Sequence, residues 1–177
     1  NNAPPPRYSK PCASPAAPLL EAALGPAPWV NLDQSWLRHG RPPHHWHQDG
    51  ALRHDFLAHA GRAAPADAAL EMRTLWIALT PCGVHAPGLE WVTAEVSGLL
   101  SPEALTPQAV SARFPAAALV HAEFEPGDAL LFDGLHLHRT HITPAMTRSR
   151  LSLELRCFRA GALPSRVSGD AGQRLPP

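Results

Sequence analysis

The feature that most constrains this chain is a set of histidine and carboxylate side chains carried by two short runs far apart in the sequence. The first run is His47-Gln48-Asp49, and the second is the stretch 127–138, which begins Gly-Asp-Ala-Leu-Leu-Phe and ends at His138. Alternate residues of a β-strand point to the same face, so His47 and Asp49 can reach one metal ion from a single strand. His138 must then come from another strand, which requires a sheet to fold over itself.

Two imidazoles and one carboxylate, with no thiolate, form a ligand set that leaves positions open on a non-haem iron ion. The chain has 11 histidines, so chance pairs are expected. His45 lies on the same strand face as His47, and His136 lies on the same face as His138, so spacing alone leaves either of them as a candidate ligand. The histidines expected at the rim or surface are His44, His54 and His141.

The run 150–157 alternates strictly between polar and apolar residues. One face carries Arg150, Ser152, Glu154 and Arg156, and the other carries Leu151, Leu153, Leu155 and Cys157. Such alternation predicts a strand whose polar face meets either solvent or an internal cavity. At ~3.3 Å per residue Arg156 lies about 20 Å along the strand from Arg150, so it is expected to matter less for a ligand bound at Arg150.

Many short strands with glycine and proline turns predict one mainly β domain, built as a barrel or sandwich. The expected organisation is an extended Pro/Ala-rich segment at 1–18, the domain at 19–160 and a C-terminal tail at 161–177. A helix is expected at 19–24, and one or two helical turns at 102–114, where Ser101-Pro102 and Thr106-Pro107 each place a capping hydroxyl before proline. Strands are expected within 29–59, with a break at 40–43, and at 73–80, 90–95, 119–124, 129–132, 135–141 and 150–158.

Composition excludes some classes of function. Fifteen basic and 15 acidic residues balance, which argues against a nucleic-acid or membrane-surface partner attracted by net charge. The 3 cysteines include no Cys-x-x-Cys pair, which predicts neither a disulfide framework nor a zinc ribbon and favours a reducing cytoplasm. The chain has no apolar run near membrane-spanning length and no signal-peptide pattern at its first residues, so a cytoplasmic location is expected.

Five colinear segments, which cover roughly residues 29 to 160, resemble the phytanoyl-CoA dioxygenase family of Fe(II)/2-oxoglutarate-dependent oxygenases. The segments are 46–50 (Trp-His-Gln-Asp-Gly), 75–79, 87–92 (Pro-Gly-Leu-Glu-Trp-Val), 127–138 and 150–158. The resemblance implies a mainly β double-stranded β-helix, a cupin-like jelly-roll barrel, with a few short helices. It also implies Fe(II), 2-oxoglutarate as cosubstrate, and O2.

The resemblance also implies a role for individual residues. The metal ligands would be His47, Asp49 and His138, with His138 favoured over His136 because the family ligand lies six residues after the position of Phe132. Arg150 would bind the distal carboxylate of 2-oxoglutarate through its planar guanidinium. Three further residues would help to bind the cosubstrate: Thr140, Trp76 and, more weakly, Ser152. Trp76 is equally well explained as an ordinary core residue.

The implied reaction is hydroxylation of a small-molecule C–H bond with release of succinate and CO2. Halogenating relatives replace the ligand carboxylate by a small residue, so the presence of Asp49 favours hydroxylation. The chain departs from the family at 93–98, where many members continue Pro-Gly-Ser-His, and Lys10 is its only lysine. A basic clamp for CoA phosphates is therefore not expected, and phytanoyl-CoA is not carried over as the substrate. The sequence does not specify the oligomeric state.

Two other functions fit parts of the pattern. One is a cupin-like metal-binding barrel without oxygenase activity, such as an isomerase or a sensor, which would have no need of Arg150 and Thr140 as a keto-acid clamp. The other is a zinc hydrolase that uses the histidine-rich segment 43–49. That segment lacks the helical His-Glu-x-x-His pattern, and its strand-like spacing fits iron better.

Overall fold

The computed structural model describes residues 16–51, 72–160 and 172–174. Strands account for most of the regular structure, with short helices at the start and between strands. The elements in chain order are α1 (Ala16–Leu24), β1 (Trp29–Gly40), β2 (Met72–Ala78), β3 (Gly88–Val92), the 3-10 turn η1 (Pro102–Leu105), α4 (Pro107–Arg113), the 3-10 turn η2 (Ala116–Ala118), β4 (Leu119–His121), β5 (Ala129–Asp133), β6 (His138–His141), β7 (Arg150–Phe158) and β8 (Gly172–Arg174).

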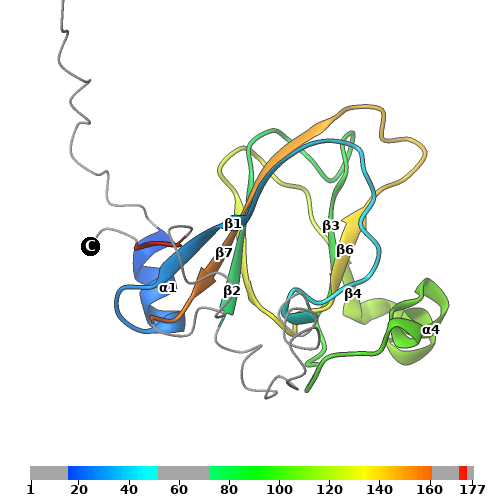
Figure 1. The fold of residues 1–177 in the computed structure, drawn as a ribbon. Coiled ribbons are helices and arrows are strands. Elements are labelled where there is room, and N and C mark those ends of the chain that lie inside the picture. The colour runs from blue at the N-terminus through cyan, green and yellow to red at the C-terminus, as the bar shows by residue number, and fades with distance from the viewer. Residues whose placement is uncertain (1–15, 52–71, 161–171, 175–177) are drawn as a thin grey trace, which may run out of the picture.

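Two antiparallel sheets face each other (Figure 1). The larger sheet has the order β5-β2-β7-β1-β8, and the smaller sheet has the order β4-β3-β6. The neighbours are not consecutive in the chain, so β7 lies between β1 and β2 and brings the last long strand into the middle of the larger sheet. The expectation of a mainly β fold with few helices is confirmed.

The polar face of β7 points into the space between the sheets. Its four polar side chains are nearly inaccessible: Arg150 is 4% exposed, Ser152 0%, Glu154 7% and Arg156 2%. On the other face Leu155 and Cys157 pack against Leu20 and Leu24 of α1. The helix therefore covers part of the outside of the larger sheet, and the cavity alternative for the polar face is confirmed rather than the solvent alternative.

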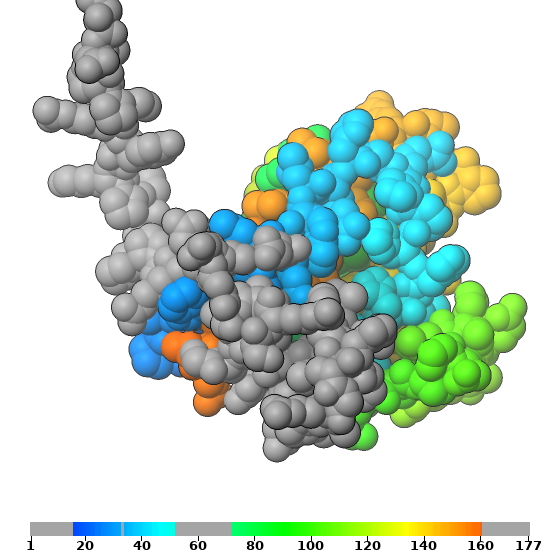
Figure 2. All heavy atoms as spheres, viewed as in Figure 1, coloured from blue at the N-terminus to red at the C-terminus, as the bar shows by residue number. Residues whose placement is uncertain are grey.

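The segment that carries His47 and Asp49 is not the regular strand that the spacing predicted. The break expected at 40–43 begins only after Gly40, the last residue of β1, and the chain has no regular structure at 41–45. His47 then makes a single β-bridge with His138, and the chain turns at Asp49. Pro42 and Pro43 have no N–H for a ladder, which limits strand formation just upstream. In Figure 2 the cyan atoms of this part of the chain lie above the green region that includes α4. The part of the expected region 29–59 beyond residue 51 lies outside the described residues.

The helical insertion expected at 102–114 is present as η1 and α4. The Thr106 hydroxyl accepts a hydrogen bond from the Ala109 N–H at 3.2 Å, whereas Ser101 makes no such capping bond to η1. Val110 and Phe114 pack with Trp46 against the smaller sheet. No helix among the described residues is both long and apolar enough to span a membrane.

Two elements near the ends of the described residues differ from those expected. The first helix begins at Ala16, three residues before the expected start. Within the segment 161–177, expected as a tail, β8 pairs with the first residues of β1 through Trp29↔Arg174 and Asn31↔Gly172.

Candidate metal centre

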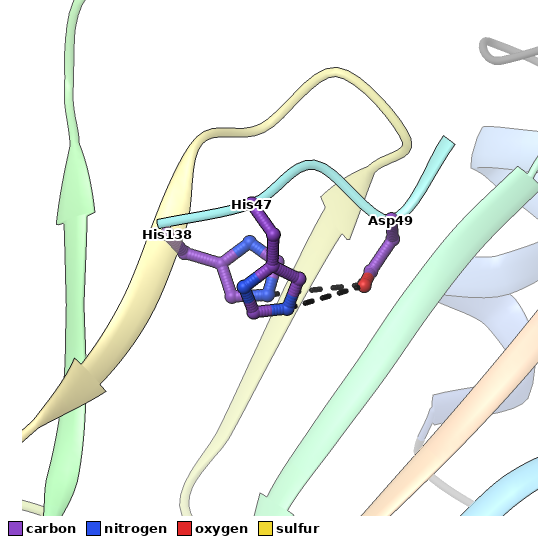
Figure 3. A group of neighbouring side chains, drawn as sticks. All are labelled: His47, Asp49 and His138. Atoms are coloured by element: carbon purple, nitrogen blue, oxygen red, sulfur yellow. Dashed lines mark ion pairs between the residues drawn. The ribbon is translucent and has the colours of Figure 1, made fainter. Parts of the chain in front are cut away.

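Three side chains predicted as ligands meet between the two sheets. His47, Asp49 and His138 each offer one ligand atom within 4.8 Å of the others. The Nε2 atom of His47 lies 3.7 Å from Asp49 Oδ1, and that of His138 lies 3.9 Å from Asp49 Oδ2. Figure 3 shows the two imidazoles side by side, with the Asp49 carboxylate facing them. The single bridge between His47 and His138 provides this approach, because it holds the two backbones together by hydrogen bonds of 3.0 and 3.1 Å.

Both imidazoles are oriented by the backbone two residues earlier in the chain. His47 Nδ1 lies 2.7 Å from the carbonyl oxygen of His45, and His138 Nδ1 lies 2.9 Å from that of His136. A carbonyl oxygen can only accept a hydrogen bond, so in each neutral ring the proton is on Nδ1 and the lone pair on Nε2 is directed toward Asp49. His45 and His136 thus contribute carbonyl groups to this arrangement, and their rings are not part of the metal-binding group.

The buried imidazole of His138 is not protonated near pH 7, so its nitrogen is available to a metal ion. Burial lowers the pKa of His138 to about 4, against the opposing effect of the Asp49 charge. His138 is therefore neutral near pH 7, which is the form that binds a metal ion.

Asp49 is held by two side chains that the sequence analysis did not connect to it. Thr74 Oγ1 donates to Asp49 Oδ2 at 2.6 Å, and Arg156 Nη2 donates to Asp49 Oδ1 at 2.7 Å. Arg156 also donates to Glu154 Oε1 at 3.0 Å, and Glu154 in turn accepts from Arg38 Nε at 2.9 Å. The expectation that Arg156 matters less than Arg150 concerned the cosubstrate, and it overlooked this contact with the metal site.

These contacts keep Asp49 ionised. Burial by itself would raise the pKa of the Asp49 carboxyl, but His138, Arg156 and His47 together with the Thr74 hydrogen bond bring it below its ordinary value. His138 is uncharged near pH 7, so Arg156 is the buried cation that stabilises the carboxylate there.

Gln48, between the two ligands, points away from them and anchors the segment. Its side-chain nitrogen donates to the carbonyl oxygens of Gly98 at 3.0 Å and Leu135 at 2.7 Å, and its oxygen accepts from the Leu100 N–H at 2.7 Å. The side chain is 1% exposed. The sequence contained no sign of this role, because the residues that Gln48 binds are remote in the chain.

A narrow cavity opens beside the two imidazoles. Its walls include the side chains assigned to the cosubstrate, Arg150, Thr140 and Trp76. Arg150 donates one hydrogen bond, from Nη1 to the carbonyl oxygen of Gly88 at 2.9 Å, and its guanidinium carbon lies 5.8 Å from the centre of the Trp76 ring. Among the described residues Arg150 forms no ion pair with a carboxylate, so a buried guanidinium faces the cavity with donors to spare.

The other predicted cosubstrate residues lie near this cavity in different ways. Thr140 is buried and its oxygen accepts from the His44 N–H at 3.0 Å, which leaves its hydroxyl proton free for the cavity. Trp76 is both a cavity wall and a core residue, since it packs edge-on against Phe124. Ser152 is fully buried next to Arg150 in the same strand but is not part of the cavity wall.

The donor set fits a divalent transition metal. Two imidazole nitrogens and one carboxylate converge, while the cavity lies beside them. This is the arrangement in which an octahedral ion keeps positions for exogenous ligands. The two imidazoles and the carboxylate are also individually oriented by hydrogen bonds, as in established metal sites.

No family model matches the sequence, and no curated protein matches it either. Solved structures do match. The chain is similar to EctD from S. alaskensis with bound Fe (TM-score 0.62, 16% identity, 82% of this chain and 50% of that one). It is also similar to the non-heme monooxygenase ThoJ in its apo form (TM-score 0.59, 15% identity, 82% of this chain and 52% of that one). A third match is the epimerase SnoN in complex with Fe3+, alpha ketoglutarate and nogalamycin RO (TM-score 0.53, 15% identity, 81% of this chain and 55% of that one).

The present chain therefore spans about half the length of these solved structures. At identities below 25% the comparison establishes the fold and leaves the activity to be argued from the site. The chain has the mainly β, cupin-like jelly-roll fold that the sequence led us to expect.

Proposed function

We propose that this chain is the catalytic barrel of a non-haem Fe(II)/2-oxoglutarate-dependent dioxygenase that hydroxylates a C–H bond of a small molecule. His47, Asp49 and His138 would hold Fe(II), and Arg150 with Thr140 would hold 2-oxoglutarate. The bound metal and keto acid supply the activation of O2, with release of succinate and CO2. The matched structures that contain Fe, or Fe3+ with alpha ketoglutarate, support this choice of metal and cosubstrate.

The observation that carries the proposal is the guanidinium of Arg150, which has no carboxylate partner within the part of the chain that the structure describes and lies in the wall of the cavity that the two imidazoles share. A buried cation without a carboxylate partner is costly, and burial lowers the pKa of Arg150 while Glu154 acts in the opposite direction. A dicarboxylate that reached the metal with one end would supply the missing counter-charge with the other. A cupin-like isomerase or sensor would have no use for such a cation at this place.

The protein's own side chains would then bind and orient the keto acid and exclude water from it. Thr140 can donate its hydroxyl proton to the same distal carboxylate, since its oxygen already accepts from the His44 N–H. Trp76 would close the cavity on its apolar side and keep water from the keto acid. Ser152 keeps only the weaker cosubstrate role that the family resemblance implies. The retained carboxylate of Asp49 favours hydroxylation over halogenation.

The test is an anaerobic titration of 2-oxoglutarate against the Fe(II) protein, followed through the visible absorption band of a metal-bound keto acid, and an aerobic assay of succinate. Arg150→Ala should raise the concentration of 2-oxoglutarate needed by roughly ten- to a hundredfold, because it removes a charge-assisted contact. Its Fe(II) affinity should stay close to that of the unaltered protein.

The matched control is Arg148→Ala, which removes an exposed arginine two residues away that does not line this cavity. It should leave both titrations unchanged. Equal 2-oxoglutarate affinity in the two variants would remove the cosubstrate assignment. Iron binding without any succinate formation or keto-acid band would favour the metal-binding barrel that is not an oxygenase.

A further inference from the structure

We propose that Thr74 and Arg156 act together as positioning residues for Asp49, and that their hydrogen bonds set how tightly the three-ligand centre binds its metal ion. We call these two side chains the Asp49 clamp. The inference rests on the proposed function, because it assumes that His47, Asp49 and His138 bind a divalent ion.

The clamp is a closed ring of three hydrogen bonds. Arg156 Nη2 donates to Asp49 Oδ1 at 2.7 Å, and Thr74 Oγ1 donates to Asp49 Oδ2 at 2.6 Å. The ring is completed by Arg156 Nη1, which donates to Thr74 Oγ1 at 2.9 Å. The two ends of one planar guanidinium thus contact Asp49 both directly and through a hydroxyl.

This ring determines the direction of each proton. Thr74 Oγ1 accepts from Arg156, so its single proton is directed to Asp49 and cannot be turned elsewhere without loss of a bond. Each Asp49 oxygen then has one donor and keeps acceptor capacity for a second partner. Oδ1 and Oδ2 lie 3.7 and 3.9 Å from the Nε2 atoms of His47 and His138, which is the side on which an ion would bind.

Burial makes the clamp rigid. Thr74 and Asp49 are 0% exposed, and Arg156 is 2% exposed and lies with its guanidinium carbon 5.3 Å from the centre of the Trp36 ring. Water therefore cannot replace a hydrogen-bond donor that Asp49 loses when Thr74 or Arg156 is substituted. Thr74 comes from β2 and Arg156 from the adjacent β7, where they are directly paired, so the sheet itself sets their separation.

The charges around the clamp alternate. Asp49 contacts Arg156, Arg156 contacts Glu154, and Glu154 contacts Arg38. Two cations and two anions are thus placed in alternation, and their contacts hold the carboxylate in one orientation before a metal ion arrives. Substitution of a residue that orients a metal ligand in this way typically lowers metal affinity or activity by about 10–100-fold.

The experiment measures binding of Mn(II) alone, by electron paramagnetic resonance, to the full chain without substrate or cosubstrate. Thr74→Val removes the hydroxyl while keeping shape and charge, and should weaken Mn(II) binding by about 10–100-fold. Arg156→Lys keeps the positive charge but not the two-pronged geometry, and should also weaken binding. Thr74→Ser keeps the hydroxyl donor, so this variant should bind Mn(II) as tightly as the unaltered protein does.

The matched control is Thr80→Val, because Thr80 also bonds to β7, through the Leu151 N–H at 2.9 Å, but does not touch Asp49. It should leave Mn(II) affinity unchanged. Circular dichroism checks that each variant is folded, and Thr74→Ala replaces Thr74→Val if the added methyl group prevents folding.

Two negative results are distinguishable. Unchanged Mn(II) affinity in folded Thr74→Val and Arg156→Lys would overturn the clamp and leave the metal site standing. Failure of the unaltered protein to bind Mn(II) or Fe(II) would overturn the proposed function and the clamp with it.

Discussion

Cys157 shows how this fold changes the chemistry of a single residue. Its thiol is 0% exposed and lies beneath α1, in contact with the apolar cluster that contains Leu20 and Leu24. Burial raises the pKa of the thiol to about 12. The thiolate is the reactive form of cysteine, and a rise of about three pKa units removes roughly 99.9% of it at a given pH below the ordinary value.

We therefore expect Cys157 to resist alkylation in the folded protein. In a Cys12→Ser background, iodoacetamide at pH 8 should label Cys157 on the order of a thousandfold more slowly than in the protein unfolded by guanidinium. Cys82, whose pKa burial also raises, should be slow as well. Peptide mass spectrometry over time gives both rates. Labelling of Cys157 at the same rate with and without denaturant would show that α1 does not protect it.

At the scale of elements, α4 depends on its first hydroxyl. The Thr106 oxygen accepts from the Ala109 N–H, and Val110 of the same helix is 0% exposed against the smaller sheet. Thr106→Ala should lower the free energy of unfolding by about 1 kcal/mol, as loss of a capping side chain typically does. Urea denaturation followed by circular dichroism measures the change.

Ser101→Ala is the matched control, since Ser101 also precedes a proline but makes no capping bond. It should shift the urea midpoint by less than Thr106→Ala. Equal shifts in the two variants would mean that the capping bond does not contribute.

The same pair of residues shows what the sequence can and cannot predict. Capping hydroxyls before proline correctly predicted a helical insertion, but not which of Ser101 and Thr106 would bond. Alternation correctly predicted that the four polar side chains of β7 share one face, because period two is a property of one strand, but it left open whether that face meets solvent or a cavity. That Arg156 would share Asp49 with Thr74 depends on β2 lying beside β7, and strand order depends on the whole chain. The short turn at Asp49 was missed because the His-x-Asp spacing also fits a strand.

At the scale of the whole molecule, the candidate metal centre joins the two sheets. His138 begins β6 of the smaller sheet, and His47 is bridged to it. Asp49 is bonded to Thr74 of β2 and Arg156 of β7, both in the larger sheet. An ion bound by all three ligands would cross-link the sheets and stabilise the folded state in preference to the unfolded one.

A divalent ion at about 100 times its dissociation constant should add about 2.7 kcal/mol to stability, which for a chain of this size raises Tm by roughly 5–10 °C. Scanning calorimetry with and without Mn(II) measures this shift. His47→Ala should abolish it, while His45→Ala, which removes an exposed ring and keeps the carbonyl, should not. If Mn(II) raised the Tm of His47→Ala as much as that of the unaltered protein, the stabilising ion would bind at another site.

The single bridge at His47 has a consequence for self-association. β6 is the last strand of the smaller sheet, and an open strand edge is a template for pairing with another chain. The backbone of His44 and His47 occupies that edge, through hydrogen bonds with Thr140 and His138. A substitution that detached this segment would expose the edge of β6 and favour aggregation. The same few residues therefore determine both the metal site and the resistance of the folded chain to aggregation.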